Sequence, residues 1–303
     1  MNNPIVEKIN QLRKEKNAVI LAHNYQLPEV QDIADFSGDS LELARIAKKT
    51  DCKVIVFCGV KFMAETAHIL NPDKLVVMPD PQAGCPLADM VGVDDLRRLK
   101  ADNPGSPVVT YVNSTAEVKA ESDVVCTSAN AVKVVSAIKT DKPIIFVPDM
   151  HLGSYVRKMT GRDLVLAPGY CPTHRHIMQE DIDERKKEMP DAVVIVHPEC
   201  SDDVVEAADF VCSTSQMLKA VENSPQAKRF VIGTEVGMLH RLRKQFPDRE
   251  FFVPSSRCVC PNMKKTTLEK LLWELESLEH KIEIDPSTRE KALGAIERML
   301  EYV

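Results

Sequence analysis

Short apolar runs alternate along this chain with charged segments of helical period. Three of the runs end in polar residues: VILAHNY at 19–25, VVTYVNS at 108–114 and VVIVHPE at 193–199. Continuously apolar strands separated by helices of about ten residues are typical of parallel sheets covered on both faces. The pattern therefore predicts an α/β chain built on parallel sheets.

The whole pattern occurs three times, and the copies align position by position. The first set of aligned residues is His23 with Tyr111 and His197, and the second is Tyr25 with Asn113 and Glu199. Further along, the aligned positions hold Asp35, Asp123 and Asp209, followed by Ser40, Ser128 and Thr214. A charged helical segment opens every copy, at 5–16, 94–102 and 179–188. Self-similarity at a period of about 86 residues indicates a fold built three times.

We expect three α/β/α sandwich domains related by a pseudo-threefold axis, followed by C-terminal helices. The predicted domains are residues 1–88, 89–175 and 176–263, with a helical segment at 264–303 that closes the assembly. Each copy is small for a free-standing domain, so the copies should pack on one another. The last segment carries the only tryptophan of the chain, Trp273.

Composition narrows the class of protein. The 303 residues are 44% apolar and 5% aromatic, with 39 basic against 45 acidic side chains and a net charge of −6. These values fit a soluble globular protein and argue against a nucleic-acid binder. No run approaches the ~20 apolar residues of a membrane helix, and the N-terminal segment lacks the apolar region of a signal peptide. Nine cysteines without a secretory signal predict a cytoplasmic protein whose thiols bind metal or lie in the core.

Three of the nine cysteines precede proline, one in each copy: Cys85, Cys171 and Cys260. All three follow the end of a predicted strand, and the proline biases each cysteine toward extended backbone. Because ligands gather at the carboxyl ends of parallel strands, we expect the three thiolates to meet at the pseudo-threefold axis. They could hold zinc with one water, or a [4Fe–4S] cluster with one open iron, and the residues alone leave that choice open. Cys258 lacks the proline, and the other cysteines fit a buried core.

The aligned polar residues also favour binding of an anion. Polar groups at equivalent ends of buried strands are costly unless they are used, at about 1–3 kcal/mol each. We expect Ser40, Ser128 and Thr214 to be helix N-caps. Three helix N-termini directed at one cavity would attract a substrate with several carboxylates or a phosphate. No GxGxxG motif follows any strand, which argues against a dinucleotide.

Longer motifs strengthen this picture. AHNYQLPEVQDIADFSGDS, MAET, AGCPLAD, PGYCPTHR, VHPECS and VCPNMKK together resemble the quinolinate synthase family, over residues 17–266. The resemblance implies a triangular three-domain α/β/α fold with one [4Fe–4S] cluster at its axis. It also implies condensation of iminoaspartate with dihydroxyacetone phosphate to quinolinate, with loss of phosphate and two waters, in NAD biosynthesis. An enzyme that produces iminoaspartate would be a functional partner.

The same resemblance implies residue roles. The cluster ligands would be Cys85, Cys171 and Cys260. The remaining site residues carried over by motif are His23, Tyr25, Ser40, Tyr111, Asn113, Ser128, His197, Glu199 and Thr214, with Met63 and His174 as weaker candidates. Among them we assign Glu199 as general base, Tyr25 as proton donor or relay and His197 as the alternative base. Some members have a CxxCxxC run at the third cysteine; here Cys258-Val-Cys260 is shorter, so the redox disulfide of that run has no basis.

Two other classes of function fit parts of the pattern. Another iron–sulfur or zinc hydrolyase acting on a polycarboxylate would keep the site and lose the phosphate chemistry. An iron–sulfur sensor would keep the cluster, but it would not need the polar residues around it. Metal analysis and an assay for quinolinate distinguish the three.

Overall fold

The computed structural model describes residues 3–302, apart from the side chains of Ser40, Leu41, Ala44, Ala47 and Leu300. Within it the chain forms two compact units. The first is Met1–Cys85 with Cys260–Glu290, and the second is Pro86–Val259 with Lys291–Val303. The first unit thus holds the first repeat, and the second holds the other two. The exact limits of the three predicted domains stay a prediction.

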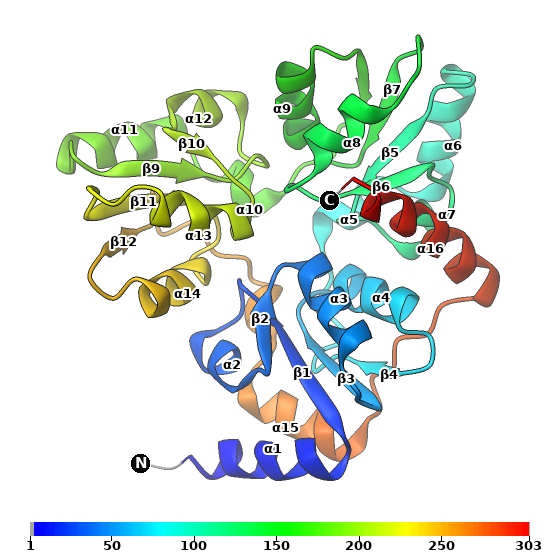
Figure 1. Cartoon of the computed structure of the whole chain (residues 1–303), viewed down its shortest axis with the longest axis vertical. Helices are drawn as coiled ribbons and strands as arrows, with labels where there is room; N and C mark the ends of the chain where they lie inside the picture. Colours follow the sequence, from blue (N-terminus) through cyan, green and yellow to red (C-terminus); the bar gives the residue numbers. More distant parts are fainter. Residues whose placement is uncertain (1–2, 303) are drawn as a thin grey trace. The chain divides into compact units, whose positions relative to one another are not determined.

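Each repeat contains one four-stranded parallel sheet (Figure 1). In the first repeat the elements are α1 Pro4–Glu15, β1 Ala18–His23, α2 Pro28–Ile33, β2 Phe36–Gly38, α3 Ser40–Lys49, β3 Val54–Cys58, α4 Lys61–Leu70 and β4 Leu75–Val77. The strand order is β2-β1-β3-β4. The predicted opening helix and apolar first strand are therefore confirmed for this copy.

The second and third repeats follow the same plan. The second contains α5 Pro86–Asp89, α6 Val93–Asp102, β5 Val108–Tyr111, α7 Ala116–Ala120, β6 Val124–Cys126, α8 Ala131–Ala137, β7 Ile144–Val147, α9 Met150–Thr160 and β8 Leu164–Leu166. The third contains α10 Pro172–Arg175, α11 Gln179–Glu188, β9 Val193–Val196, α12 Asp202–Ala207, β10 Phe210–Val211, α13 Thr214–Glu222, β11 Arg229–Gly233, α14 Met238–Gln245 and β12 Glu250–Phe252. Their strand orders, β6-β5-β7-β8 and β10-β9-β11-β12, match that of the first sheet. The predicted fold class is confirmed.

One hydrogen-bond motif marks all three copies. A carboxylate that precedes the edge strand accepts the backbone N–H of a residue in the first strand. The pairs are Asp35 with Ile20 (2.8 Å), Asp123 with Val108 (2.7 Å) and Asp209 with Val194 (2.8 Å). These are the three aspartates that the sequence aligns, so the internal alignment is also an alignment of structure.

The C-terminal segment contains the 3-10 helix η1 Met263–Lys265, then α15 Leu268–Ser277 and α16 Pro286–Leu300. Helix α15 belongs to the first unit, where Leu271 and Leu275 are buried in one core with Ile9 of α1 and with Ile20 and Val56 of the sheet. Figure 1 shows α1 and α15 together beside β1 and β3. A segment from the end of the chain thus completes the core of the first repeat.

The second unit joins its two repeats by polar contacts between helices α9 and α12. The hydroxyl of Ser154 donates to Asp202 (2.9 Å), and Lys158 pairs with Glu206 (2.9 Å). Both repeats lie in the same compact unit, so residues from both can form one site. Among the described residues, no helix is long and apolar enough to span a membrane.

Candidate active site

The turn after β9 carries two polar residues that contact side chains of the second repeat. His197 and Glu199 are both buried, two positions apart. The backbone N–H of Glu199 donates to Nδ1 of His197 (3.3 Å), and Oε2 of Glu199 lies 3.4 Å from the same nitrogen. In a neutral ring whose Nδ1 accepts this N–H, the proton lies on Nε2, which contacts the hydroxyl of Ser128 from the second repeat (3.2 Å). Burial also lowers the pKa of His197 against the pull of Glu199, which favours the neutral ring.

Glu199 lies between residues of both repeats. Its Oε2 is 2.7 Å from Nδ1 of His174, and its Oε1 accepts a hydrogen bond from the amide of Asn113 (3.2 Å). Burial alone would raise the pKa of Glu199, but the imidazoles of His174 and His197 outweigh it and hold the pKa well below its usual range. The two imidazoles therefore favour the ionised form of this carboxylate.

His174 is the residue that the sequence motifs ranked too low. It lies on α10, three residues after Cys171, and its side chain is almost fully buried. Its ring stacks on that of His197, with centroids 4.7 Å apart. Its second nitrogen, Nε2, lies 2.8 Å from the hydroxyl of Thr234, which follows β11. The CPTHR motif gave a signal for His174, whereas Thr234 was not predicted at all.

Another buried acid, Asp149, was also missed. It follows β7 and caps α9, where one carboxylate oxygen accepts the N–H groups of His151 and Leu152. Burial, followed by the charge of Glu199, raises the pKa of Asp149. A polar residue at the end of the third strand of a repeat is the signal that would have found both Asp149 and Thr234.

The prediction that Ser128 and Thr214 are helix N-caps is wrong for helices α8 and α13. Helix α13 is capped by Ser213, whose hydroxyl accepts the N–H of Gln216, and Thr214 is already its first helical residue. Helix α8 begins at Ala131, and the residue at its N-cap position is Asn130, two positions after Ser128. The residue that caps must have extended backbone and sit outside the helix, a condition that Ser213 meets. Ser128 and Thr214 are thus not used as caps.

The first repeat shows the same displacement. Asp39, not Ser40, accepts the N–H of Glu42 at the start of α3 (2.9 Å). The side chain of Ser40 lies outside the described residues, so its predicted contact with substrate stays a prediction.

The turn after β1 is built like the turn after β9. The backbone N–H of Tyr25 donates to Nδ1 of His23 (3.2 Å), an arrangement that in a neutral ring would put the proton on Nε2. The two rings meet edge to face, 4.6 Å apart. Lys264 donates to the carbonyl of Tyr25 (2.6 Å) and so ties this turn to the segment after Cys260. Both side chains are buried.

The remaining predicted residues fall at strand ends or in helices. Tyr111 ends β5 and is buried, and Asn113 follows it. Met63 is buried within α4, where its sulfur lies close to Gly59. No polar contact of Met63 distinguishes it from a core residue within the described part of the chain.

The nine cysteines divide into two groups. Cys85, Cys171 and Cys260 are partly exposed, whereas the other six are buried. In the buried group burial raises the thiol pKa in every case: Cys52, Cys58, Cys126, Cys200, Cys212 and Cys258. A raised pKa disfavours the thiolate that metals bind. The three cysteines that precede proline are therefore the ones whose surroundings suit a metal centre.

Cys171 lies next to the polar cluster. Its Sγ, a ring nitrogen of His174 and a carboxylate oxygen of Glu199 all lie within 4.8 Å of one another, a donor set that could bind a metal ion. Cys85 and Cys260 belong to the first unit and Cys171 to the second. The joining of all three thiolates in one centre therefore stays a prediction.

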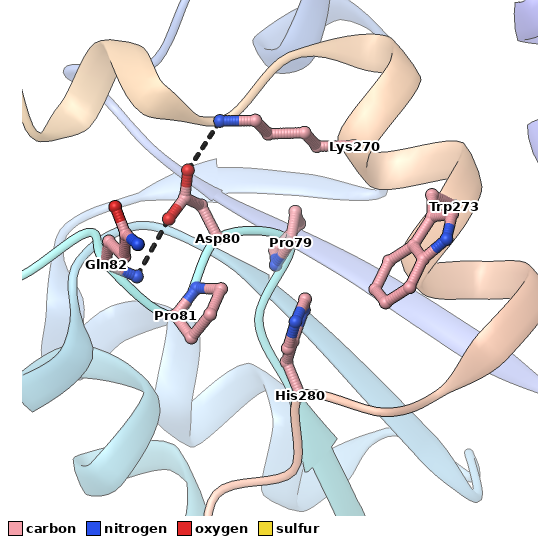
Figure 2. Close-up of a pocket in the computed structure, with 7 residues that line it drawn as sticks. All are labelled: Pro79, Asp80, Pro81, Gln82, Lys270, Trp273 and His280. Carbon is pink, nitrogen blue, oxygen red and sulfur yellow. Dashed lines mark hydrogen bonds and ion pairs between the residues drawn. The ribbon is translucent and has the colours of Figure 1, made fainter.

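The first unit also has a hollow of about 380 Å³ (Figure 2). Its lining residues are Pro79, Asp80, Pro81, Gln82, Lys270, Trp273 and His280. Lys270 points to Asp80 and pairs with it (2.5 Å), so the charges at this edge are already matched. None of the predicted site residues lines this hollow.

Comparisons with known proteins agree with the motifs. Residues 7–301 match the family described as "Quinolinate synthetase A protein". A protein of Dehalococcoides mccartyi strain CBDB1 named "Quinolinate synthase" is 55% identical over 99% of this chain and 98% of its own length. Two further proteins of the same name are similar throughout. The one from Thermodesulfovibrio yellowstonii is 53% identical over 100% of both chains, and the one from Alkaliphilus metalliredigens is 51% identical over 98% of both chains.

Proposed function

Because the chain belongs to the quinolinate synthetase A family, we propose that it is an enzyme that condenses iminoaspartate with dihydroxyacetone phosphate to quinolinate. Phosphate and two waters are lost, and the product supplies the pyridine ring for NAD biosynthesis. The observation that carries the proposal is identity above 50% along the whole length of relatives named for this activity. The buried cluster around Glu199 supports it, because it combines an ionised carboxylate with neutral donors.

The proposed cofactor is a [4Fe–4S] cluster held by Cys85, Cys171 and Cys260. The donor set fits, because these three thiols are the partly exposed cysteines and all others are buried. When bound, such a cluster with three protein ligands supplies one open iron as a Lewis acid for a substrate oxygen. Since a cluster requires thiolates, we further propose that the enzyme works in the reducing cytoplasm.

Glu199 is the proposed general base. Its lowered pKa favours the ionised form, which can accept a proton, and also makes it a weaker base than a free carboxylate. His174 and Asn113 hold its two oxygens, so the carboxylate cannot rotate freely. Tyr25 is the proposed proton donor or relay, and His197 is the alternative base.

The substrate-binding residues are proposed to be neutral donors directed at anions. They are His23, Ser40, Tyr111, Asn113, Ser128 and Thr214. The Nε2–H groups of His23 and His197 can donate to carboxylate or phosphate oxygens without adding charge, because the backbone holds Nδ1 of each ring as an acceptor. Thr214, as the first residue of α13, lies where backbone N–H groups attract an anion.

The substrate itself suggests a partner. Iminoaspartate is an imine and hydrolyses in water, so we propose a functional link with the enzyme that produces it.

A second candidate, a zinc hydrolyase acting on a polycarboxylate, is favoured by one contact. The donor set of Cys171, His174 and Glu199 has the mixed sulfur, nitrogen and oxygen character that zinc accepts. Metal analysis separates the two: iron and sulfide in about equal amounts support the cluster, and one zinc per chain supports the hydrolyase.

The deciding experiment is an anaerobic assay for quinolinate with iminoaspartate and dihydroxyacetone phosphate. We expect product with the purified protein, and none with Cys85→Ala, Cys171→Ala or Cys260→Ala, each of which should also lose its iron. Cys258→Ala is the matched control, because this thiol is buried two positions from Cys260, and it should keep iron and activity. Loss of iron from Cys258→Ala with retention in Cys260→Ala would reverse the ligand assignment. Iron-loaded protein that makes no quinolinate would refute the proposed reaction.

A further inference from the structure

The turns after β1 and β5 each accept hydrogen bonds from a buried side chain of the helix that follows. In the first repeat, Nε2 of Gln31 on α2 donates to the carbonyls of Asn24 (3.0 Å) and Gln26 (2.9 Å), which uses both of its hydrogens. In the second repeat, the amino group of Lys119 on α7 donates to the carbonyl of Ser114. Gln31 is 6% exposed and Lys119 is fully buried. In both repeats a buried polar side chain thus binds the backbone of the preceding turn.

These contacts occupy the same place in the two repeats. The shift along the chain that aligns β1 with β5 also aligns Gln31 with Lys119 and Gln26 with Ser114. The third repeat has Val205 at this position, a partly buried residue that packs against the core. The fold therefore accepts an apolar side chain here. Because burying an amide or an amine costs free energy, the two polar residues do more than fill the core.

We propose that Gln31 and Lys119 are positioning residues for the reaction, which hold the turns that carry Tyr25 and Asn113. Gln31 binds the carbonyls on both sides of Tyr25, the proposed proton donor. Lys119 binds the carbonyl directly after Asn113, whose amide holds Oε1 of Glu199 (3.2 Å). Both act through the backbone of the turn. The inference rests on the proposed function only for its kinetic consequence, since the rigidity of the turns can be measured without turnover.

The kinetic test removes each donor and keeps an unbranched side chain of similar length. Methionine meets this condition, and loss of one buried partner is worth about a tenfold change. We expect Gln31→Met and Lys119→Met each to lower kcat about tenfold, with a smaller rise in KM and with iron content close to wild type. Lys119→Gln should retain more of kcat than Lys119→Met, because a glutamine holds the equivalent turn of the first repeat.

Asn71→Leu is the matched control. Asn71 is a buried amide of the first unit that also donates to a backbone carbonyl, that of Ala67 (2.9 Å). It follows α4, which returns from the end of β3 to the start of the parallel strand β4, so it lies at the end of the sheet opposite to the turn after β1. We expect this variant to lower the melting temperature and to leave kcat unchanged. A loss of kcat in Asn71→Leu as large as that in Gln31→Met would reduce Gln31 to an ordinary core residue.

The second test needs no activity. Hydrogen–deuterium exchange on the full-length, anaerobically purified protein follows the hydrogen-bonded backbone amides of the two turns, which are those of Asn24, Tyr25, Gln26, Val112 and Ser114. Gln31→Met should speed exchange about tenfold in the first turn, and Lys119→Met should do so in the second, because each turn opens more often without its donor. Asn71→Leu should change neither.

Unchanged exchange in both turns would overturn the proposal, whatever the effect of the variants on kcat. If exchange responds as expected but wild-type protein makes no quinolinate, the proposed reaction fails and the holding of the turns stands.

Discussion

The turn after β1 and the turn after β9 have the same backbone design and different chemistry. In both, a histidine ends the strand or follows it directly, and its Nδ1 accepts the N–H of the residue two positions on (3.2 and 3.3 Å). That residue is Tyr25 in one copy and Glu199 in the other. The repeat thus places an imidazole at the same position twice. The residue two positions later, Tyr25 or Glu199, decides which functional group lies next to that imidazole.

The corresponding turn of the second repeat has lost the histidine. Tyr111 takes its place, and Asn113 donates its side-chain amide to Glu199 of the next repeat. The N–H of Val112 donates to the carbonyl of Cys126, as that of Asn24 does to Gly38 in the first repeat. A copy without the imidazole therefore supports the carboxylate of its neighbour. Three equivalent positions have diverged into a phenol, an amide and a carboxylate.

The largest loss of activity should come from replacing Glu199 or Tyr25, the residues in which the turns after β9 and β1 differ. Glu199→Gln keeps the size and the hydrogen bond from Asn113 but removes the base. General-base catalysis contributes about 10²–10⁴-fold, so kcat should fall by that factor while iron content and affinity for quinolinate are retained. Tyr25→Phe should lower kcat similarly. Steady-state kinetics with iron analysis and calorimetric binding measure all three quantities.

If Glu199→Gln turns over at the wild-type rate, the base lies elsewhere. His197 is then the next residue to replace, and the contrast between the two turns loses its chemical meaning.

An intermediate effect should come from the histidines, in which the two turns agree. Glutamine places its amide N–H where Nε2–H of histidine lies, whereas asparagine places it near Nδ1. We therefore expect His23→Gln and His197→Gln to raise KM only a few fold, and His23→Asn and His197→Asn to raise it about ten- to a hundredfold, the value of a hydrogen bond to a charged group. A KM that rises more in the glutamine variant than in the asparagine variant at either position would mean that Nδ1 faces the substrate.

The smallest effect concerns two neighbouring residues at the start of α13. Ser213 caps the helix and Thr214 does not. Ser213→Ala should cost about 0.5–2 kcal/mol of unfolding free energy with little change in KM. Thr214→Ala should leave the melting temperature nearly unchanged and raise KM several fold. The reverse pattern, measured by thermal unfolding and kinetics on both variants, would return Thr214 to a structural role.

The sequence predicted what depends on the repeat and missed what depends on contacts between strand ends. The three aligned aspartates make the same hydrogen bond in every copy, because each sheet is built in the same way. The caps were displaced because hydroxyl-bearing or acidic side chains stand in a row, as at Ser213 and Thr214, and composition cannot tell which has the extended backbone.

Thr234 escaped prediction for a different reason. Its partner His174 lies 60 positions away, and no repeat of the chain places an equivalent pair in register. Periodicity reveals residues that share a place in successive copies. Its position after a central strand marks Thr234 as a candidate, but a contact made in only one copy has no signal of its own in the repeat, and it emerges only when the strand ends are brought together in space.

The route of the chain through the first unit has a consequence for synthesis on the ribosome. Leu271 and Leu275 of α15 complete the core around β1 and β3, and Cys260 returns to the unit that holds Cys85. At about 5–20 residues per second, Cys85 emerges on the order of ten seconds or more before Cys260 and α15. The first-made part of the protein is therefore among the last to finish folding, and the nascent chain must carry a partly exposed thiol until its own end arrives.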